Sequence, residues 1–223
     1  MKNSRVYVGL AADIIHEGHI NILKTAKKYG HVTVGLLTDK AIASYKKFPH
    51  LSFYQRKIIL ENIKYVDKVI TQKTLDYRPN LIRLKPNYVV HGNDWKTGIQ
   101  KKTRLDVIKT LKKWSGKLIE PNYTKNISSS MIKKKINEIG LSTSTRVSRL
   151  KRLLAAKDII RIAETHSALN ALIIEKSSVI KKNRLLEFDG MWSSSLTDSL
   201  SRGKPDNQSV DYSTRINGLN EIL

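Results

Sequence analysis

The chain has 223 residues, 40% hydrophobic and 27% charged, and its 41 Lys and Arg against 19 Asp and Glu give a formal charge of +22. This length suffices for one complete globular domain and part of another. Cysteine is absent, which excludes a disulfide framework and a cysteine-based zinc site. The sequence has no signal-like apolar run at Met1 to Arg5 and no stretch of 18 apolar residues, so we expect a cytoplasmic protein.

The first 139 residues alternate between hydrophobic strands and segments of helical periodicity. We expect strands at 5–10, 31–38, 67–71, 88–92 and 116–120, and helices at 18–29, 52–63, 77–84, 101–114 and 128–139. This alternation is typical of a parallel sheet covered by helices on both faces. Ligands of such sheets bind beyond the carboxyl ends of the strands, where His16, Gly92 and Asn93 fall. The predicted fold class is therefore α/β with a Rossmann-like parallel sheet.

A Ser/Thr-rich break interrupts the alternation after residue 139. It precedes a basic segment that predicts a helix at about 146–156. We therefore predict a nucleotide-binding domain at 1–139, a linker at 140–147 and a second segment at 148–223.

The segment His16-Glu17-Gly18-His19 stands where the first strand gives way to the first helix. A helix N-terminus offers unpaired N–H groups and the positive end of the helix dipole, so phosphate binds there readily. Gly18 lets the backbone approach a ligand, and His16 and His19 can donate to oxygens that gain charge during phosphoryl or nucleotidyl transfer. A metal pair and two ordinary polar residues are the alternatives, and the preceding strand with Asp13 favours phosphate chemistry.

Three further motifs follow in order: Tyr45-Lys46-Lys47 with Gln55-Arg56-Lys57, Gly92-Asn93-Asp94-Trp95, and Ile127-Ser128-Ser129-Ser130-Met131-Ile132. With these motifs, residues 1 to about 139 resemble cytidylyltransferases of the nucleotidyltransferase superfamily, most closely the glycerol-3-phosphate type. Two departures are specific. The usual Gly-Thr-Phe-Asp reads Leu10-Ala11-Ala12-Asp13, and Tyr123 replaces an arginine that usually precedes the last motif, which leaves the acceptor open.

The resemblance implies that an acceptor oxygen attacks the α-phosphorus of CTP and that pyrophosphate leaves. The implied catalytic residues are His16, His19 and Lys46. The implied nucleotide-binding residues are Leu10, Ala11, Asp13, Gly18, Arg56, Gly92, Asn93, Asp94, Trp95, Ser128, Ser129 and Ser130. Mg²⁺ is expected to arrive with CTP and to bind chiefly phosphate oxygens, with Asp13 as the candidate protein ligand.

Structural alternatives remain open for several of these residues. Lys46 and Lys47 are equally compatible with a solvated surface, and Arg56 with a helix-surface arginine. Trp95 is compatible with packing at the sheet edge, and capping a helix explains one of the serines.

The remainder of the chain carries a second resemblance. The runs 161–166, 187–199 and 203–206 resemble the start of a phosphoenolpyruvate mutase of the isocitrate lyase superfamily. The resemblance implies a substrate site containing Trp192, Ser194 and Leu196, and a gate loop with Asp206. A (β/α)8 barrel needs roughly 250 residues, so we expect an incomplete barrel segment at 148–223, with mutase activity only if the missing barrel were present.

Three functions compete. The first is CMP transfer to a small phosphonate, such as 2-aminoethylphosphonate or a hydroxyalkylphosphonate. The second is cytidylyl transfer to a phosphate alcohol such as glycerol 3-phosphate, or adenylyl transfer from ATP. The third, a non-enzymatic basic nucleic-acid-binding protein, lacks a recognised module, and only 7% of residues are aromatic. We therefore expect CTP and a phosphonate or phosphate acceptor as partners, no nucleic acid, no membrane, and a homodimer as the candidate assembly.

Overall fold

The computed structural model describes residues 4–122, 132, 143–181 and 184–222. The chain divides into two compact units, Met1–Ala156 and Lys157–Leu223.

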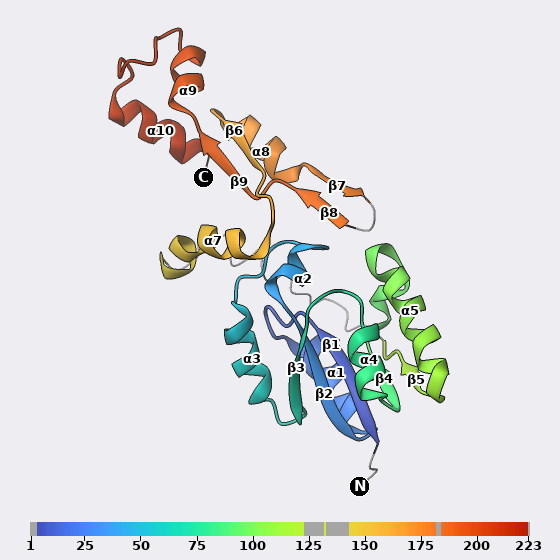
Figure 1. The fold of residues 1–223 in the computed structure, drawn as a ribbon. Coiled ribbons are helices and arrows are strands. Elements are labelled where there is room, and N and C mark those ends of the chain that lie inside the picture. The colour runs from blue at the N-terminus through green and yellow to red at the C-terminus, as the bar shows by residue number, and fades with distance from the viewer. Residues whose placement is uncertain (1–3, 123–131, 133–142, 182–183, 223) are drawn as a thin grey trace. The chain divides into compact units, whose positions relative to one another are not determined.

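The first unit is built on a five-stranded parallel sheet in the order β3-β2-β1-β4-β5 (Figure 1). The strands are β1 (Arg5–Leu10), β2 (His31–Leu37), β3 (Lys68–Gln72), β4 (Tyr88–Val90) and β5 (Lys117–Ile119). The helices are α1 (Glu17–Lys27), α2 (Asp39–Ala43), α3 (Phe53–Glu61), α4 (Arg78–Leu84), α5 (Lys101–Leu111) and α7 (Thr143–Ala156). Short 3-10 turns lie at Asn93–Lys96, Gly98–Gln100 and Lys112–Trp114.

This architecture confirms the predicted α/β class with a Rossmann-like parallel sheet. All five predicted strands are present, as are the helices expected at 18–29, 52–63, 77–84 and 101–114, with ends that differ by a few residues. Helix α2 was not expected. The helix expected at 128–139 lies outside the described residues, Ile132 excepted.

Alternate residues of β1 serve two separate hydrophobic cores. Val6 and Val8 pack on one face of the sheet with Leu23 of α1 and Leu60 of α3. Tyr7 points to the other face, where the residues of α4 and α5 pack. Because successive side chains of a strand point to opposite faces, one hydrophobic strand can hold helices on both sides.

Two glycines at matched positions in β1 and β2 make room for tyrosines on the second face. Gly9 and Gly35 are register partners. A Cβ at Gly9 would lie 2.2 Å from the Tyr77 hydroxyl oxygen, and a Cβ at Gly35 would lie 1.7 Å from the Tyr7 hydroxyl oxygen. No side chain fits at either position without moving a buried tyrosine, so these glycines allow Tyr77 to lie close to the end of β1.

Helix α7 belongs to the first unit, although we expected the second segment to begin at 148. The side chain of Arg152 explains this, because it donates to the carbonyl oxygens of His50 and Pro49. The described part of the predicted linker 140–147 is the beginning of α7, and its other residues lie outside the described part of the chain.

The second unit contains β6 (Ile162–Thr165), α8 (Ala168–Lys176), β7 (Ser178–Lys181), β8 (Arg184–Glu187), β9 (Gly190–Ser193), α9 (Ser195–Ser201) and α10 (Tyr212–Ile222). Strands β6 and β9 pair in parallel, whereas β7 and β8 form an antiparallel hairpin. The expected barrel segment is not confirmed, because the only parallel pairing described in this unit joins two strands and a hairpin separates them in sequence.

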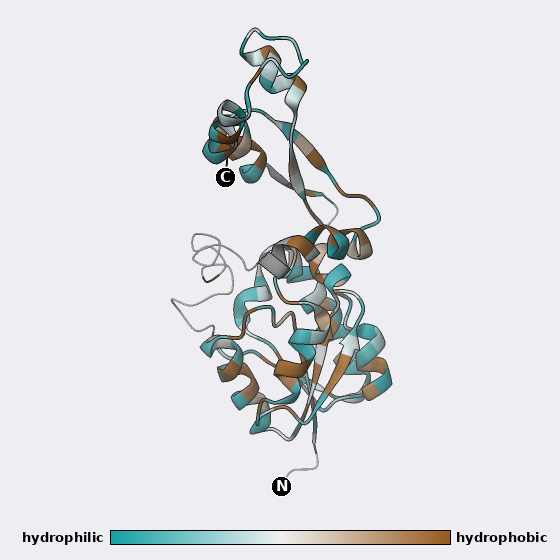
Figure 2. Cartoon of the chain, turned by 90° about the vertical axis from the view of Figure 1, so that its left-hand side faces the viewer, coloured by the Kyte–Doolittle hydropathy of each residue, from teal (hydrophilic) through white to brown (hydrophobic). Residues whose placement is uncertain are grey.

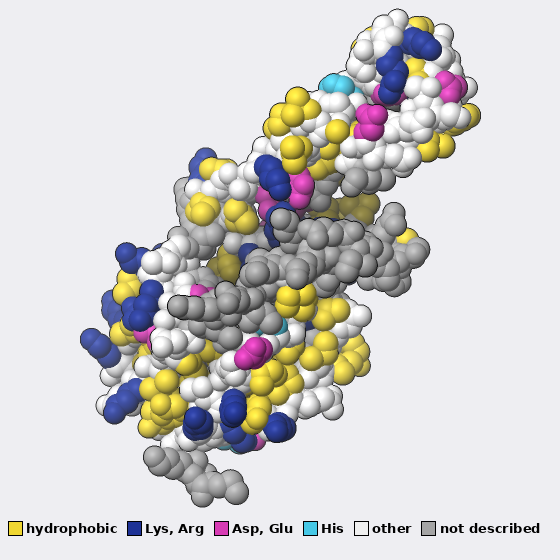
Figure 3. All heavy atoms as spheres, turned by 180° about the vertical axis from the view of Figure 1, so that it is seen from behind, with side chains coloured by type: hydrophobic (Ala, Val, Ile, Leu, Met, Phe, Trp, Pro, Cys, Tyr) yellow, Lys and Arg dark blue, Asp and Glu magenta, His cyan; other side chains and the backbone are white. Residues whose placement is uncertain are grey.

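The strands of the second unit contain hydrophobic residues (Figure 2). Several of these side chains are exposed to solvent: Val179 is 58% exposed, Ile180 60% and Trp192 64%. In the view of Figure 3, basic side chains are spread over the first unit among apolar and acidic ones. Within the described residues, no helix has both the length and the apolar character needed to cross a bilayer.

Candidate functional site

The first unit has a cavity of about 310 Å³ where β1, β2 and β4 end. Strand β1 lies between β2 and β4, and the chain continues from β1 to β2 on one side and reaches β4 only later on the other. This is the point of a parallel sheet where strand order reverses, and ligands bind there. The cavity is lined by Val8, Gly9, Leu10, Ala11, His16, Gly18, His19, Ile22, Leu37, Tyr45, Lys46, Tyr77, His91, Gly92, Asp94 and Gln100.

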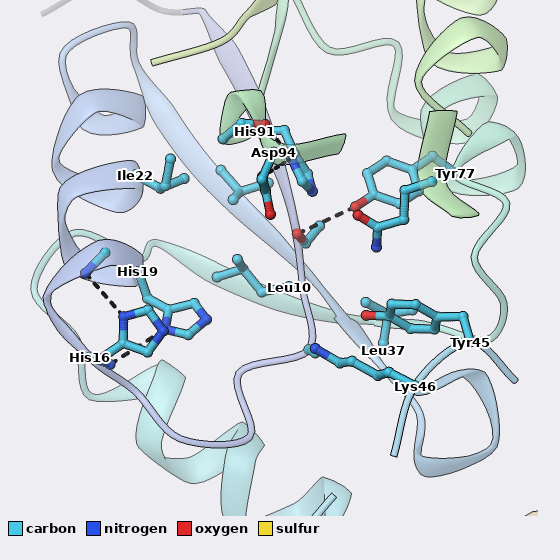
Figure 4. Close-up of a pocket in the computed structure, with 16 residues that line it drawn as sticks. Leu10, His16, His19, Ile22, Leu37, Tyr45, Lys46, Tyr77, His91 and Asp94 are labelled. Atoms are coloured by element: carbon cyan, nitrogen blue, oxygen red, sulfur yellow. Dashed lines mark hydrogen bonds and ion pairs between the residues drawn. The ribbon is translucent and has the colours of Figure 1, made fainter. Parts of the chain in front are cut away.

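His16 and His19 stand together on the cavity side of the first turn of α1 (Figure 4). His16 is the N-cap of the helix, and its Nδ1 accepts the N–H of Gly18 at 3.1 Å. His19 Nδ1 accepts the N–H of His16 at 3.4 Å, which completes a capping box. The ring centroids are 4.0 Å apart. The two imidazoles are therefore held by the helix start itself.

These hydrogen bonds fix the tautomer of each ring. A backbone N–H can only donate, so both Nδ1 atoms are unprotonated and each neutral ring carries its proton on Nε2. Burial lowers the pKa of His19 to about 3, aided by His16 and Lys46, and burial and Lys46 also lower the pKa of His16. Both side chains are thus neutral Nε2–H donors near neutral pH.

The histidines also change how the helix start can bind an anion. We expected its backbone N–H groups to face phosphate. Instead, the His16 ring accepts the N–H of Gly18, and the His16 carbonyl oxygen accepts the N–H groups of His19 and Ile20 at 2.9 and 3.2 Å. The N–H groups of Gly18, His19 and Ile20 are therefore bonded within the turn, and the imidazole Nε2–H groups are the side-chain donors that this turn offers to a ligand.

Lys46 faces the histidines from the segment that follows α2 (Figure 4). Its Nζ lies 5.3 Å from the centre of the Tyr45 ring. Burial lowers the pKa of Lys46, while Asp13 and Asp94 oppose that shift. Lys46 is the one Lys or Arg among the lining residues described here, whereas its neighbour Lys47 is exposed.

The segment after β4 brings Gly92 and Asp94 to the cavity, together with His91, which sequence reasoning missed. His91 Nδ1 donates to the Gly92 carbonyl oxygen at 2.9 Å, since a carbonyl can only accept. Trp95 does not line the cavity. It is 1% exposed, and its Nε1–H donates to Glu120 Oε1 at 2.8 Å. Asn93 lies outside the cavity lining, with its N–H bonded to the carbonyl oxygen of Pro121.

Arg56 and Asp13 are buried around the cavity and do not line it. The Arg56 guanidinium donates to the carbonyl oxygens of Ala11, Leu37 and Leu51 and to the Asp39 carboxylate. Asp13 is 2% exposed, and its Oδ1 accepts the N–H of Leu51 at 2.9 Å. Both side chains therefore tie together the segments whose ends form the cavity.

The placement of Asp13 does not fit a magnesium ligand. Mg²⁺ takes an octahedral shell of oxygen ligands and usually keeps several waters, whereas this carboxylate is buried and accepts the N–H of Leu51 in the segment that precedes α3. Within the described residues, no three His, Cys, Asp or Glu side chains gather where they could hold a metal ion.

The other predicted site residues lie elsewhere. Ser128, Ser129, Ser130 and Tyr123 fall outside the described residues. In the second unit, a cavity of about 240 Å³ is lined by Ser194 but not by Trp192, Leu196 or Asp206. Ser194 caps α9, and Asp206 accepts a hydrogen bond from Ser195 Oγ at 3.2 Å.

Sequence reasoning also missed Tyr45 and Tyr77 as lining residues, along with Gln100. Tyr45 directly precedes the predicted Lys46 in the sequence, and this position could have identified it as a lining residue. His91 directly follows the apolar core of β4, so its position at the carboxyl end of a strand was a second one. Tyr77 and Gln100 carry no motif that distinguishes them.

Curated relatives match the first half of the chain. Glycerol-3-phosphate cytidylyltransferase of Bacillus subtilis (strain 168) is 36% identical over 85 residues, covering 37% of this chain and 66% of that protein. FAD synthase of Archaeoglobus fulgidus is 38% identical over 82 residues, covering 37% of this chain and 60% of that protein. Ethanolamine-phosphate cytidylyltransferase of Arabidopsis thaliana is 31% identical over 99 residues, covering 42% of this chain and 24% of that protein.

The matched segments thus span about two thirds of these relatives or less. None of the three matches covers half of this chain. The family model named Cytidylyltransferase-like matches residues 7–135, which hold the whole described cavity. Because this match covers more than half of the 223 residues, the chain belongs to the cytidylyltransferase-like family.

Proposed function

We propose that this chain is a cytidylyltransferase that moves CMP from CTP to a small acceptor carrying a phosphonate or phosphate group. The observation that carries the proposal is the pair of neutral Nε2–H donors on His16 and His19, which share one cavity with Lys46. Phosphoryl and nucleotidyl transfer need little covalent participation from a protein. They depend on hydrogen-bond donors and positive charges that the protein holds next to the phosphate oxygens.

In the proposed reaction, an oxygen of the acceptor dianion attacks the α-phosphorus of CTP. The bond between that phosphorus and the α–β bridging oxygen breaks, and pyrophosphate carries away the electron pair. No protein group has to take a proton. His16 and His19 donate to oxygens that gain charge, and Lys46 offsets negative charge from the opposite side of the cavity.

Lys46 is the group of the cavity lining that can offset the charge of a bound anion, and Asp94 lies in the same lining. Lys46 is held in a partly buried position where desolvation disfavours its charged form. The negative charge of a polyphosphate bound beside Lys46 would favour the charged form of its amino group. Magnesium is proposed to enter with CTP on the phosphate oxygens, since Asp13 does not fit as its ligand.

The proposed acceptor is a small phosphonate. This rests on the sequence of the second unit, whose runs at 187–199 and 203–206 resemble an enzyme that forms a carbon–phosphorus bond. A second candidate is a phosphate alcohol, and the names of two relatives, which act on glycerol 3-phosphate and ethanolamine phosphate, favour it. FAD contains an adenylyl group, so the match to a protein named FAD synthase makes ATP the nucleotide to compare with CTP.

A pyrophosphate-release assay tests the proposal. CTP, ATP, GTP and UTP are each combined with 2-aminoethylphosphonate, a hydroxyalkylphosphonate, glycerol 3-phosphate or ethanolamine phosphate, with Mg²⁺ and with EDTA. We expect release with CTP and Mg²⁺, dependent on a phosphonate. Equal release with ATP would remove the cytidylyl assignment, and release only with phosphate alcohols would establish the second candidate.

A further inference from the structure

The loop that carries Lys46 is held from outside the cavity by one side chain of α7. The family match ends at residue 135, so α7 lies beyond it, although α7 belongs to the first unit. Arg152 Nη1 donates to the His50 carbonyl oxygen at 2.7 Å, and Nη2 donates to the Pro49 carbonyl oxygen at 3.1 Å. Its guanidinium also lies 5.0 Å from the centre of the Phe48 ring. Arg152 therefore contacts three consecutive residues of the loop at 44–52.

The same guanidinium is linked to the floor of the cavity through Asp39. Arg152 Nη2 lies 3.3 Å from Asp39 Oδ2, and Arg56 Nη2 lies 2.6 Å from Asp39 Oδ1. Arg56 in turn donates to the carbonyl oxygens of Ala11 and Leu37, which line the cavity. The Asp39 carboxylate thus connects Arg152, which contacts the loop at 44–52, with Arg56, which binds residues at the ends of β1 and β2.

These contacts suit arginine specifically. The guanidinium is a planar fork whose N–H groups can reach two carbonyl oxygens and a carboxylate while its face lies on an aromatic ring. Lysine keeps the charge but has one compact donor group on a flexible stem. Arg152 is only partly exposed, with 18% of its side chain accessible, so these contacts are little screened by water.

We propose that Arg152 is a positioning residue for the nucleotidyl-transfer site, acting through the loop that holds Lys46. This rests on the proposed function, in which Lys46 must keep its amino group opposite His16 and His19 inside the cavity. Lys46 is only two residues from Phe48, and its own N–H is bonded to the Ile42 carbonyl oxygen at 3.1 Å. With α2 fixing one side of the loop and Arg152 the other, Lys46 has little freedom to leave the cavity.

The first test does not depend on activity. Hydrogen exchange of the amides of 44–52 is measured in the full chain and in Arg152→Met, with Arg149→Met as the matched control. Arg149 is exposed and lies three residues earlier on α7. We expect exchange in this loop to rise at least tenfold in Arg152→Met, to rise less in Arg152→Lys, and to stay unchanged in Arg149→Met. Equal exchange in the Arg152→Met and Arg149→Met variants would overturn the proposal.

The second test is a double-mutant cycle on kcat/KM for CTP. Arg152→Met is expected to lower kcat/KM about tenfold when Lys46 is present and to have a much smaller effect in a Lys46→Met background, because residues that act through one another are not additive. Additive losses would overturn the positioning role. Absence of turnover in the unmodified chain would refute the proposed function instead, and hydrogen exchange would still decide whether Arg152 holds the loop.

Discussion

The His91 ring lies parallel to the Trp95 indole, with 3.8 Å between the ring centroids and 8° between the planes. Trp95 is fixed in turn by Glu120, which also accepts two hydrogen bonds from Arg104. These contacts lower the pKa of Glu120 to about 2, so it is a carboxylate at neutral pH. Trp95 therefore supports the His91 ring, which lines the cavity. The motif predicted that Trp95 itself would contact the nucleotide.

This arrangement predicts that replacing His91 changes nucleotide binding more than the chemical step. His91→Phe keeps a flat ring on Trp95 and removes both ring nitrogens. We expect KM for CTP to rise several-fold while kcat changes less than twofold. Steady-state kinetics measures both, and Lys96→Met, at an exposed position outside the cavity lining, is the control. Unchanged KM would show that the wall does not contact the nucleotide.

Replacing Arg56 is predicted to destabilise the first unit. Its side chain is fully buried and donates to three carbonyl oxygens and to Asp39. Removing one partner of a buried ion pair typically costs about 3–5 kcal/mol. Arg56→Met should lose a comparable free energy of unfolding in urea. A loss of activity with unchanged unfolding would instead support the nucleotide contact expected from the sequence.

The difference between the expected and observed roles of Arg56 and Trp95 shows the limit of motif reasoning. The alternation of strands and helices predicted the sheet, because the apolar runs at 5–10, 31–37 and 88–90 reflect burial on both faces. A motif gives order along the chain. It does not show whether a side chain ends in the cavity or behind it, since this depends on packing between distant segments such as Ala11, Leu37 and Leu51 around Arg56.

Other features carried too little local signal. Helix α2 has five residues, which is shorter than the span over which helical periodicity can be recognised. The occupation of the first-turn N–H groups by His16 depends on side-chain rotamers. Arg152 could not be connected with the site because more than 100 residues separate it from His50.

The buried histidine predicts a dependence of stability on pH. The pKa of His19 is about 3 in the folded protein and about 6.5 in an unfolded chain. Between these values the unfolded chain binds more protons, so this group makes stability rise with pH and fall on acidification. The contribution is up to about 1.4 kcal/mol per pH unit.

His19→Asn removes the titratable imidazole, while the asparagine Oδ1 can still accept the N–H of His16. The free energy of unfolding is measured in urea at pH 4.5 and pH 7. We expect the unmodified chain to lose more stability on acidification than His19→Asn. Equal losses in the two proteins would contradict the buried, neutral state of His19.

The two adjacent lysines are predicted to differ in function. Lys46 lines the cavity and Lys47 is exposed. Lys46→Met should lower kcat/KM at least tenfold because a charge beside the phosphates is lost, whereas Lys47→Met should change it less than twofold. The comparison is made at low and at high salt, since a contribution from an exposed lysine would be screened. Equal losses would mean that a general basic field, and not a placed amino group, assists the reaction.

In the proposed reaction, the Nε2–H groups of His16 and His19 stabilise charge on the transferring nucleotidyl group. The most direct measurement is kcat for CTP in His16→Asn and His19→Asn, because asparagine Oδ1 can replace each capping Nδ1 while the cavity-facing donor is lost. We expect each variant to keep its unfolding midpoint and lose at least about a hundredfold in kcat, as for other lost oxyanion donors. A variant that folds normally and turns over at the unmodified rate would contradict the claim for that histidine.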